Sequence, residues 1–165
     1  MNSLRAFDTN TARLVARLPK NLQRPFELLG WAAAPPVWGA VIAVIILFQL
    51  PQGIAMSVAV FLCMPIATVI KFAFRRQRPP TIYAGNMRIK SYSFPSSHAY
   101  AAALGSGYLA YIAWINDLLV LAILAMLLTL TIGISRIYLG AHYPSDVIGG
   151  WLLGSGVLGV IILCL

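Results

Sequence analysis

Side chains that could carry acid, base and anion chemistry gather at the borders of apolar segments in this chain. Four basic residues close the second apolar run: Lys71, Arg75, Arg76 and Arg78. Six further polar residues stand at the borders of the third, fourth and fifth runs: Ser96, Ser97, His98, Arg136, His142 and Asp146. The chain has two histidines, and both belong to this set. Because ionisable groups at membrane depth are costly, they usually serve a function.

Convergent cations and two histidines are the components of a phosphoryl-transfer site. Several cations at one point bind an anion, phosphate above all, and helix N-termini add backbone N–H donors. A histidine beside cations tends to be neutral, and a neutral imidazole can act as a nucleophile. Asp146 follows His142 by four residues, so on a helical turn its carboxylate could fix the imidazole tautomer. His98 would then serve as general acid. A zinc site is the alternative, which nearby positive charge disfavours.

Three motifs in this region are more specific. Residues 71–79 fit K-x6-R-P, residues 95–98 fit P-S-G-H except at Ser97, and residues 135–146 fit S-R-x5-H-x3-D. In this order they resemble the motifs of the type 2 phosphatidic acid phosphatase family, which shares its site with vanadium haloperoxidases. The resemblance covers residues 71–146, roughly half of the chain.

The resemblance implies which residues bind phosphate. Lys71, Arg78 and Arg136 would hold its oxygens and stabilise a pentacoordinate transition state, as preorganised charge does in other enzymes. Ser96 would add its hydroxyl and Ser97 its backbone N–H. Because Ser97 replaces the family glycine, a side chain stands where the phosphate approaches closely, unless it points away.

The resemblance also implies a catalytic sequence. His142 would attack phosphorus and form a phosphohistidine, which water then hydrolyses. His98 would protonate the leaving group, and Asp146 would orient His142. The family needs no metal ion, so the implied enzyme is a metal-independent phosphatase without a cofactor.

Composition places these residues in a membrane protein. The chain of 165 residues is 60% hydrophobic and 10% charged, whereas an average soluble domain has about 25% charged residues. Disorder is excluded as well, since it requires low hydrophobicity. The net charge of +8 is typical of basic cytoplasmic loops that attract anionic lipid. Too few polar residues remain for a nucleic-acid-binding face. Cys63 and Cys164 lie in apolar runs and are not expected to form a disulfide.

Five apolar runs predict an all-α fold, a polytopic membrane helix bundle with about five transmembrane helices. The runs are residues 31–50, 54–72, 97–115, 118–134 and 147–165, and about 20 apolar residues span a bilayer. Gly150 and Gly154 have the spacing of a helix-packing face. That face could pack within one chain or between chains, so the oligomeric state stays open.

The N-terminal segment differs from the rest of the chain. Residues 1–30 are basic and amphipathic, and residues 31–165 form the predicted transmembrane phosphatase domain. Apolar residues near position 15 have helical spacing, Asn10 or Thr11 could cap the helix, and Pro19 would end it. The segment is therefore predicted to form an interfacial helix on the membrane. It contains no apolar core of a signal peptide.

Charge distribution predicts the orientation. Five spans place the N-terminus and both long connections on one face, where all twelve Lys and Arg residues lie. By the positive-inside rule this face is cytoplasmic, in the inner membrane of a bacterial cell. Arg75 and Arg76 are expected to snorkel to lipid headgroups, and Tyr143 to belong to the interfacial aromatic belt.

The predicted function is hydrolysis of a phosphate monoester or diphosphate of a membrane lipid. Candidate substrates are phosphatidate, phosphatidylglycerophosphate and polyprenyl phosphates or diphosphates, including phosphoribosylated carriers. A lipid phosphotransferase that passes the phosphohistidine to an alcohol is one alternative. A vanadate-dependent haloperoxidase is another, which small size and the membrane context disfavour. A non-catalytic membrane scaffold or transporter is the third. The expected partners are the bilayer and its lipid phosphates.

Overall fold

The computed structural model describes residues 2–32, 37, 65–81 and 91–164. Every regular element in these residues is a helix, which confirms the all-α prediction. In chain order the elements are α1 (Asn2–Val15), the 3-10 helix η1 (Lys20–Leu22), α2 (Gln23–Ala32), a helix over Pro65–Phe74, α6 (Ser97–Ile115), α7 (Leu119–Tyr138) and α8 (Pro144–Cys164). The predicted first run lies almost entirely outside the described residues.

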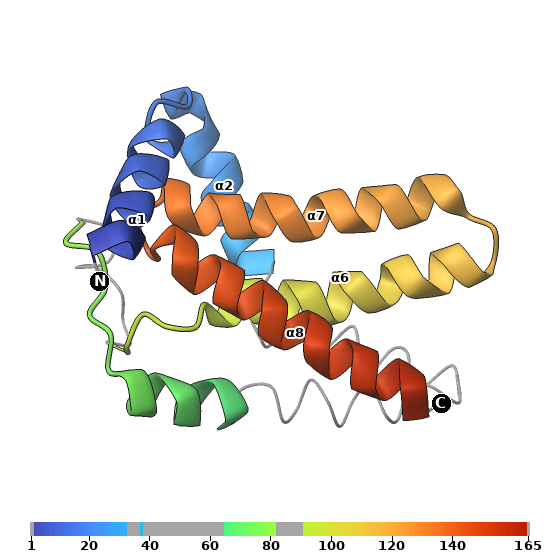
Figure 1. Cartoon of the computed structure of the whole chain (residues 1–165). Coiled ribbons are helices and arrows are strands. Elements are labelled where there is room, and N and C mark those ends of the chain that lie inside the picture. Colours follow the sequence, from blue (N-terminus) through green and yellow to red (C-terminus); the bar gives the residue numbers. More distant parts are fainter. Residues whose placement is uncertain (1, 33–36, 38–64, 82–90, 165) are drawn as a thin grey trace.

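Helix α6 is the central element of the bundle. It packs along both α7 and α8, whereas α7 and α8 touch each other only briefly (Figure 1). Alanine and glycine dominate α6, and the side chains of Ala99, Ala102 and Ala103 are buried. Small side chains let helix backbones approach closely, which supplies the packing that lipid does not drive.

Two glycines of α8 make the closest approach to α6. A Cβ atom at Gly150 would lie 2.6 Å from the carbonyl oxygen of Ser96, and one at Gly154 would lie 2.6 Å from that of Tyr100. Any side chain at either position would therefore collide with backbone. The Gly150 and Gly154 face therefore packs within the chain, and the oligomeric state stays open.

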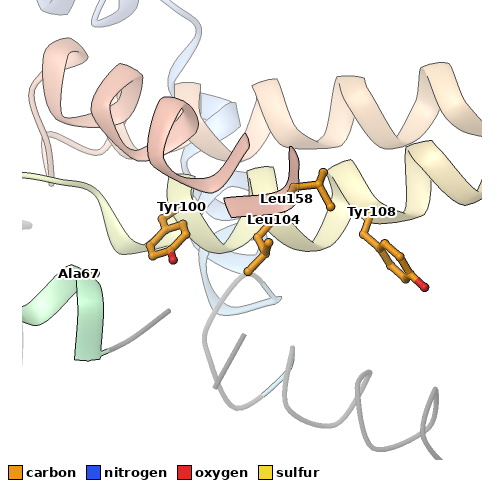
Figure 2. Close-up of a cluster of buried hydrophobic side chains, with 5 residues drawn as sticks. All are labelled: Ala67, Tyr100, Leu104, Tyr108 and Leu158. Atoms are coloured by element: carbon orange, nitrogen blue, oxygen red, sulfur yellow. The ribbon is translucent and has the colours of Figure 1, made fainter. Parts of the chain in front are cut away.

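A buried apolar cluster joins α6 to its neighbours. It consists of Tyr100, Leu104 and Tyr108 from α6, Leu158 from α8 and Ala67 from the Pro65–Phe74 helix (Figure 2). The cluster ties the helix that carries the first motif to the helices that carry the other two. It thus fixes the relative positions of the motifs.

Two described helices, α7 and α8, are long and apolar enough to cross a membrane. The outward face of α7 exposes large apolar side chains, among them Val120, Ile123 and Leu124, as expected of a surface in contact with lipid. Helix α6 has 19 residues, but its many small residues make it less apolar. The count of five spans stays a prediction.

The N-terminal segment packs across one end of the bundle. Helix α1 contacts α7 and α8, and α2 contacts α7 (Figure 1). The predicted cap at Asn10 or Thr11 is wrong, because α1 begins at Asn2 and both residues lie inside it. The helix ends at Val15, before Pro19. The division at residue 30 stays a prediction, and α2 runs across that position.

Candidate active site

The three motifs meet at one end of the bundle. The N-termini of α6 and α8, the C-terminus of α7, the chain after Phe74 and helix α1 all lie at this end (Figure 1). The opposite end holds the turn between α6 and α7, with Asp117 in a left-handed conformation. The polar motif residues therefore lie at one end of the bundle, away from the apolar middle of its helices.

His142 is the centre of this end. It lies in the connection between α7 and α8 and is 3% exposed. Its Nε2 is 3.0 Å from Nη1 of Arg78, and its Nδ1 is 3.7 Å from Oδ2 of Asp146. A guanidinium has donors only, so Nε2 must accept from Arg78, and we assign the proton to Nδ1 on the Asp146 side. Nε2 therefore carries the in-plane lone pair of the ring, and in this structure that lone pair accepts a hydrogen bond from Arg78.

His142 is held in its neutral form. Its pKa falls from 6.5 to about 4: burial lowers it most, the charges of Arg78 and Lys71 also lower it, and the Asp146 carboxylate raises it. Desolvation and neighbouring cations both disfavour an imidazolium. At neutral pH the ring is therefore a potential nucleophile.

A tight turn places His142. The backbone N–H groups of Ala141 and His142 donate to the carbonyl of Arg136 at 3.0 and 3.3 Å. Gly140 has φ +66, a conformation that favours glycine. The hydroxyl of Thr81 donates to the carbonyl of Gly140 at 2.9 Å. This bond ties the chain after the first motif to the turn of the third.

Asp146 lies in the first turn of α8 and is completely buried. Its Oδ2 accepts from the backbone N–H of Tyr143 at 2.8 Å and from the hydroxyl of Ser93. Its Oδ1 accepts from Nη1 of Arg76 at 2.6 Å. These bonds hold the carboxylate in one orientation beside His142. A carboxylate so placed can fix the tautomer of the ring.

The first-motif cations are anchored by backbone carbonyls. Lys71 donates from Nζ to the carbonyls of Tyr92 and Pro95 at 3.0 and 2.8 Å. Arg78 donates from Nε to the carbonyl of Ser91 and from Nη1 to that of Ala141, both at 2.8 Å. These bonds fix both cations close to the segment before α6, and Arg78 also reaches the turn that carries His142.

Arg136 is buried at the end of α7. Its Nη2 donates to the carbonyl of Phe26 in α2 at 2.9 Å, and its Nε donates to the hydroxyl of Ser135 at 3.2 Å. Gly30 in α2 faces the guanidinium so closely that a Cβ there would lie 2.0 Å from Nη2. The N-terminal segment therefore helps to place a cation of the third motif.

The second motif opens α6. Ser96 is buried and caps the helix, with its hydroxyl accepting from the N–H of Ala99 at 3.4 Å. Its own N–H donates to the backbone carbonyl of Asp146 at 3.0 Å, which joins the N-termini of α6 and α8. Ser97 and His98 follow in the first turn and are half-buried. The fold thus gathers all the predicted site residues at one end.

Sequence reasoning missed Arg76 and Asp8. The prediction that Arg76 snorkels to headgroups is wrong, because its guanidinium pairs with Asp146 at 2.6 Å and with Asp8 at 2.5 Å. It also lies over the ring of Tyr143, with Cζ 4.4 Å from the centroid. The chain has only four acidic residues, and that scarcity is the one signal that could have marked Asp8.

A cavity of about 820 Å³ adjoins the site. It lies between the N-terminal segment and the residues around the end of α7, and it reaches His142 and Tyr143. Arg13, Lys20 and Asp8 are among the residues that line it. Of the predicted site residues, His142 is the one that the described lining of the cavity contains.

Comparison with known proteins identifies the family. Residues 52–165 match the family model of the PAP2 superfamily. The chain therefore belongs to this superfamily, as the motifs predicted.

Three relatives are informative. An undecaprenyl-diphosphatase of Sulfolobus acidocaldarius is 31% identical over 130 residues, which cover 73% of this chain and 60% of the relative. Phosphatidylglycerophosphatase B of Bacillus subtilis is 37% identical over 93 residues, 52% of this chain and 44% of the relative. A decaprenylphosphoryl-5-phosphoribose phosphatase of Mycobacterium tuberculosis is 38% identical over 106 residues, 61% of this chain and 54% of the relative. The matches span about half of each relative.

Two solved structures share the fold. A transmembrane PAP2-type phosphatidylglycerolphosphate phosphatase from Bacillus subtilis superposes with a TM-score of 0.87 at 23% identity, covering 99% of this chain and 87% of that one. LpxE from Aquifex aeolicus superposes with a TM-score of 0.76 at 21% identity, covering 94% of both chains. At these identities the likeness concerns the fold alone.

Proposed function

We propose that this protein hydrolyses a phosphate monoester or diphosphate of a membrane lipid through a phosphohistidine on His142, without a metal ion. One observation carries the proposal. A buried, neutral histidine lies between a guanidinium 3.0 Å from Nε2 and a carboxylate 3.7 Å from Nδ1. The guanidinium can bind the phosphoryl group beside the nucleophilic nitrogen, and the carboxylate can stabilise the charge that the ring acquires.

In the first step the phosphoryl oxygens accept hydrogen bonds from Arg78, Lys71 and Arg136. Arg78 thereby releases the lone pair of Nε2. That lone pair attacks phosphorus, and the bond from phosphorus to the leaving oxygen breaks. His98 gives its proton to that oxygen, and the Nδ1–H of His142 faces Asp146 throughout. Ser96 and the N–H of Ser97, at the N-terminus of α6, add donors to the phosphoryl group.

In the second step water replaces the leaving group. His98, now neutral, takes a proton from water, whose oxygen attacks the phosphohistidine. The nitrogen–phosphorus bond breaks, its electron pair returns to Nε2, and inorganic phosphate leaves. Both histidines recover their original protonation states, so the cycle closes without another reactant.

The substrate class is supported by the relatives. Their names specify an undecaprenyl diphosphate, a phosphatidylglycerophosphate and a phosphoribosylated decaprenyl phosphate. These compounds share a phosphate on a long lipid, and α7 and α8 supply apolar surface beside the site. We therefore place the lipid chain along the bundle and the phosphate at its polar end.

We further propose that the site faces the cytoplasm from the inner membrane. Helix α1, with Arg5 and Arg13, lies at the site end of the bundle, and Arg17 follows it in the next turn. Positive charge favours the cytoplasmic side. Five spans would then put the C-terminus outside the cytoplasm. A topology reporter fused after Leu165 should score external, and a cytoplasmic score would contradict this orientation.

Phosphate release tests the function directly. The purified protein, in detergent with EDTA, should release phosphate from one or two members of a panel of lipid phosphates and diphosphates. His142→Ala should lower kcat by about 10⁴-fold or more, as loss of a nucleophile does elsewhere. Asp117→Asn, at the opposite end of the bundle, is the control and should match the wild type. Its left-handed backbone suits asparagine as well as aspartate.

Other outcomes would change the assignment. Loss of phosphate release on adding EDTA, restored by a divalent cation, would contradict metal independence. Product that appears only when an alcohol acceptor is present, with little free phosphate, would indicate the phosphotransferase alternative. Full activity in His142→Ala would overturn the phosphohistidine.

A further inference from the structure

Asp8 is a buried acid on a helix that is otherwise basic and exposed. It is 2% exposed, and its carboxylate accepts three types of donor. Nη2 of Arg76 lies 2.5 Å from Oδ2. The backbone N–H of Ser145 is 2.9 Å from Oδ1, and the hydroxyl of Ser145 is 2.9 Å from Oδ2. A buried charge with this many partners is held in one place.

Arg76 connects Asp8 to the site. Its Nη2 binds Asp8, while its Nη1 binds Oδ1 of Asp146 at 2.6 Å and the hydroxyl of Ser145 at 2.6 Å. The flat guanidinium also lies over the ring of Tyr143. A planar fork with both nitrogens occupied has a single orientation. The position of Arg76 relative to Asp146 therefore depends on Asp8.

The charges add a second reason for this arrangement. Arg76 alone would neutralise Asp146, and the paired carboxylate would do little for a cationic ring at His142. With Asp8 on the other side, the group of two carboxylates and one guanidinium keeps a net charge of −1. The group therefore stays anionic while Asp146 stays anchored.

We propose that Asp8 is a positioning residue for phosphoryl transfer: through Arg76 it holds the Asp146 carboxylate in place beside His142 and so makes helix α1 part of the catalytic apparatus. The proposal rests on the function proposed above for Asp146. It differs from a purely structural role, in which Asp8 would only fasten α1 to the first turn of α8 through Ser145.

A double-mutant cycle separates the two roles. Asp8→Asn should lower kcat by about 10- to 100-fold, the range found when partners behind a functional histidine are removed, with KM unchanged because Asp8 does not touch the phosphate. Arg76→Gln should lower kcat at least as much. If Asp8 acts through Arg76, the double variant should be no slower than Arg76→Gln alone. Multiplicative losses, or a kcat for Asp8→Asn within about twofold of wild type, would overturn the proposal.

Two further variants serve as controls for the cycle. Asp8→Glu keeps the charge and should have a kcat closer to wild type than Asp8→Asn. An equally slow Asp8→Glu would contradict a charge-dependent role, and this comparison still holds if Asp8→Asn folds poorly. Asp117→Asn serves as the matched control, since it makes the same chemical change at an exposed position in the distant turn.

A spectroscopic measurement distinguishes failure of this proposal from failure of the proposed function. The chain has two histidines, so their ring ¹⁵N signals can be assigned with one variant of each. Asp8→Asn should shift the Nδ1 signal of His142, which faces Asp146, and Asp117→Asn should leave it unchanged. Unchanged His142 signals in Asp8→Asn would overturn the proposal. A shifted signal in a protein that releases no phosphate would support positioning by Asp8 and contradict the hydrolase.

Discussion

The first turn of α8 and the middle of the same helix are held in place by different kinds of interaction. In the first turn Asp146 is held by hydrogen bonds from Arg76, Ser93 and the backbone of Tyr143. In the middle Gly154 lies against the backbone of α6 with no room for a Cβ. One contact depends on matching charges and donors, and the other on the absence of a side chain.

The two contacts also differ in how many segments of the chain supply their partners. Gly154 needs only α6, whereas Asp146 depends on residues from several segments, reaching back through Arg76 to Asp8 in α1. We therefore expect changes at the polar end to lower the rate. Changes in the middle of the helix should lower stability with little effect on the rate.

Gly30→Ala should produce the largest effect of this kind at the polar end. The new Cβ would lie 2.0 Å from Nη2 of Arg136, so the flexible guanidinium must move and lose its bond to the carbonyl of Phe26. Displacement of a catalytic group by about 1 Å can cost about 10²-fold in rate. We expect kcat to fall by about this factor with the melting temperature nearly unchanged.

Gly159→Ala is the control for that change, because a Cβ at Gly159 meets no atom within 4 Å among the described residues. It should leave both rate and melting temperature close to wild type. Normal activity in Gly30→Ala would mean that the rate does not depend on the exact position of Arg136. The expected difference between the polar end and the middle of α8 would then not hold at this residue.

Acid pH should act on the polar end through His142. Because burial lowers its pKa to about 4, the neutral nucleophile prevails above that pH, and kcat/KM should fall about tenfold per unit below it. Between pH 6.5 and 4 the unfolded state binds more protons at this site than the folded state does, so stability should also decline on acidification. Rates and melting temperatures measured at each pH separate the two effects.

An acid limb centred near pH 6.5 would contradict the burial of His142, and the absence of any limb would contradict its role as nucleophile, provided that the chemical step limits the rate.

Gly154→Ala should have the smallest effect on rate and a clear effect on stability. Its Cβ would lie 2.6 Å from the carbonyl oxygen of Tyr100, and overpacking of this kind costs about 1–3 kcal/mol. Gly156→Ala is matched to it, since a Cβ there meets no described atom within 4 Å. We expect a lower melting temperature for Gly154→Ala alone, with kcat per folded protein preserved in both. A large loss of kcat in Gly154→Ala would erase the distinction between the two regions.

Much of the site was accessible from residue spacing. The interval between His142 and Asp146 predicted that they lie close together, and the ring and the carboxylate are 3.7 Å apart. The helical turn expected between them is absent, because His142 lies in the connection before α8, which begins at Pro144. The convergence of the three motifs also followed from their positions at the ends of apolar runs. Their catalytic roles stay predictions.

Other features had no local signal. Arg76 was expected in the headgroups because a lone arginine at the end of an apolar run usually snorkels. Its pairing with Asp8 joins residues 68 positions apart, and no periodicity relates them. The start of α1 at Asn2 was missed for a similar reason: helix α1 is stabilised by packing on α7 and α8 rather than by a cap at Asn10 or Thr11.

The sequence by itself determined the apolar runs, their small-residue packing face and the motif residues, because these depend on spacing along one helix or turn. Only the tertiary structure decided that Gly150 and Gly154 pack within the chain, that Phe26 binds Arg136 where Gly30 leaves room for it, and that Asp8 and Asp146 share Arg76. Buried charges must find partners wherever the fold brings donors and acceptors together. Those partners are selected by position in space, which spacing along the chain does not encode.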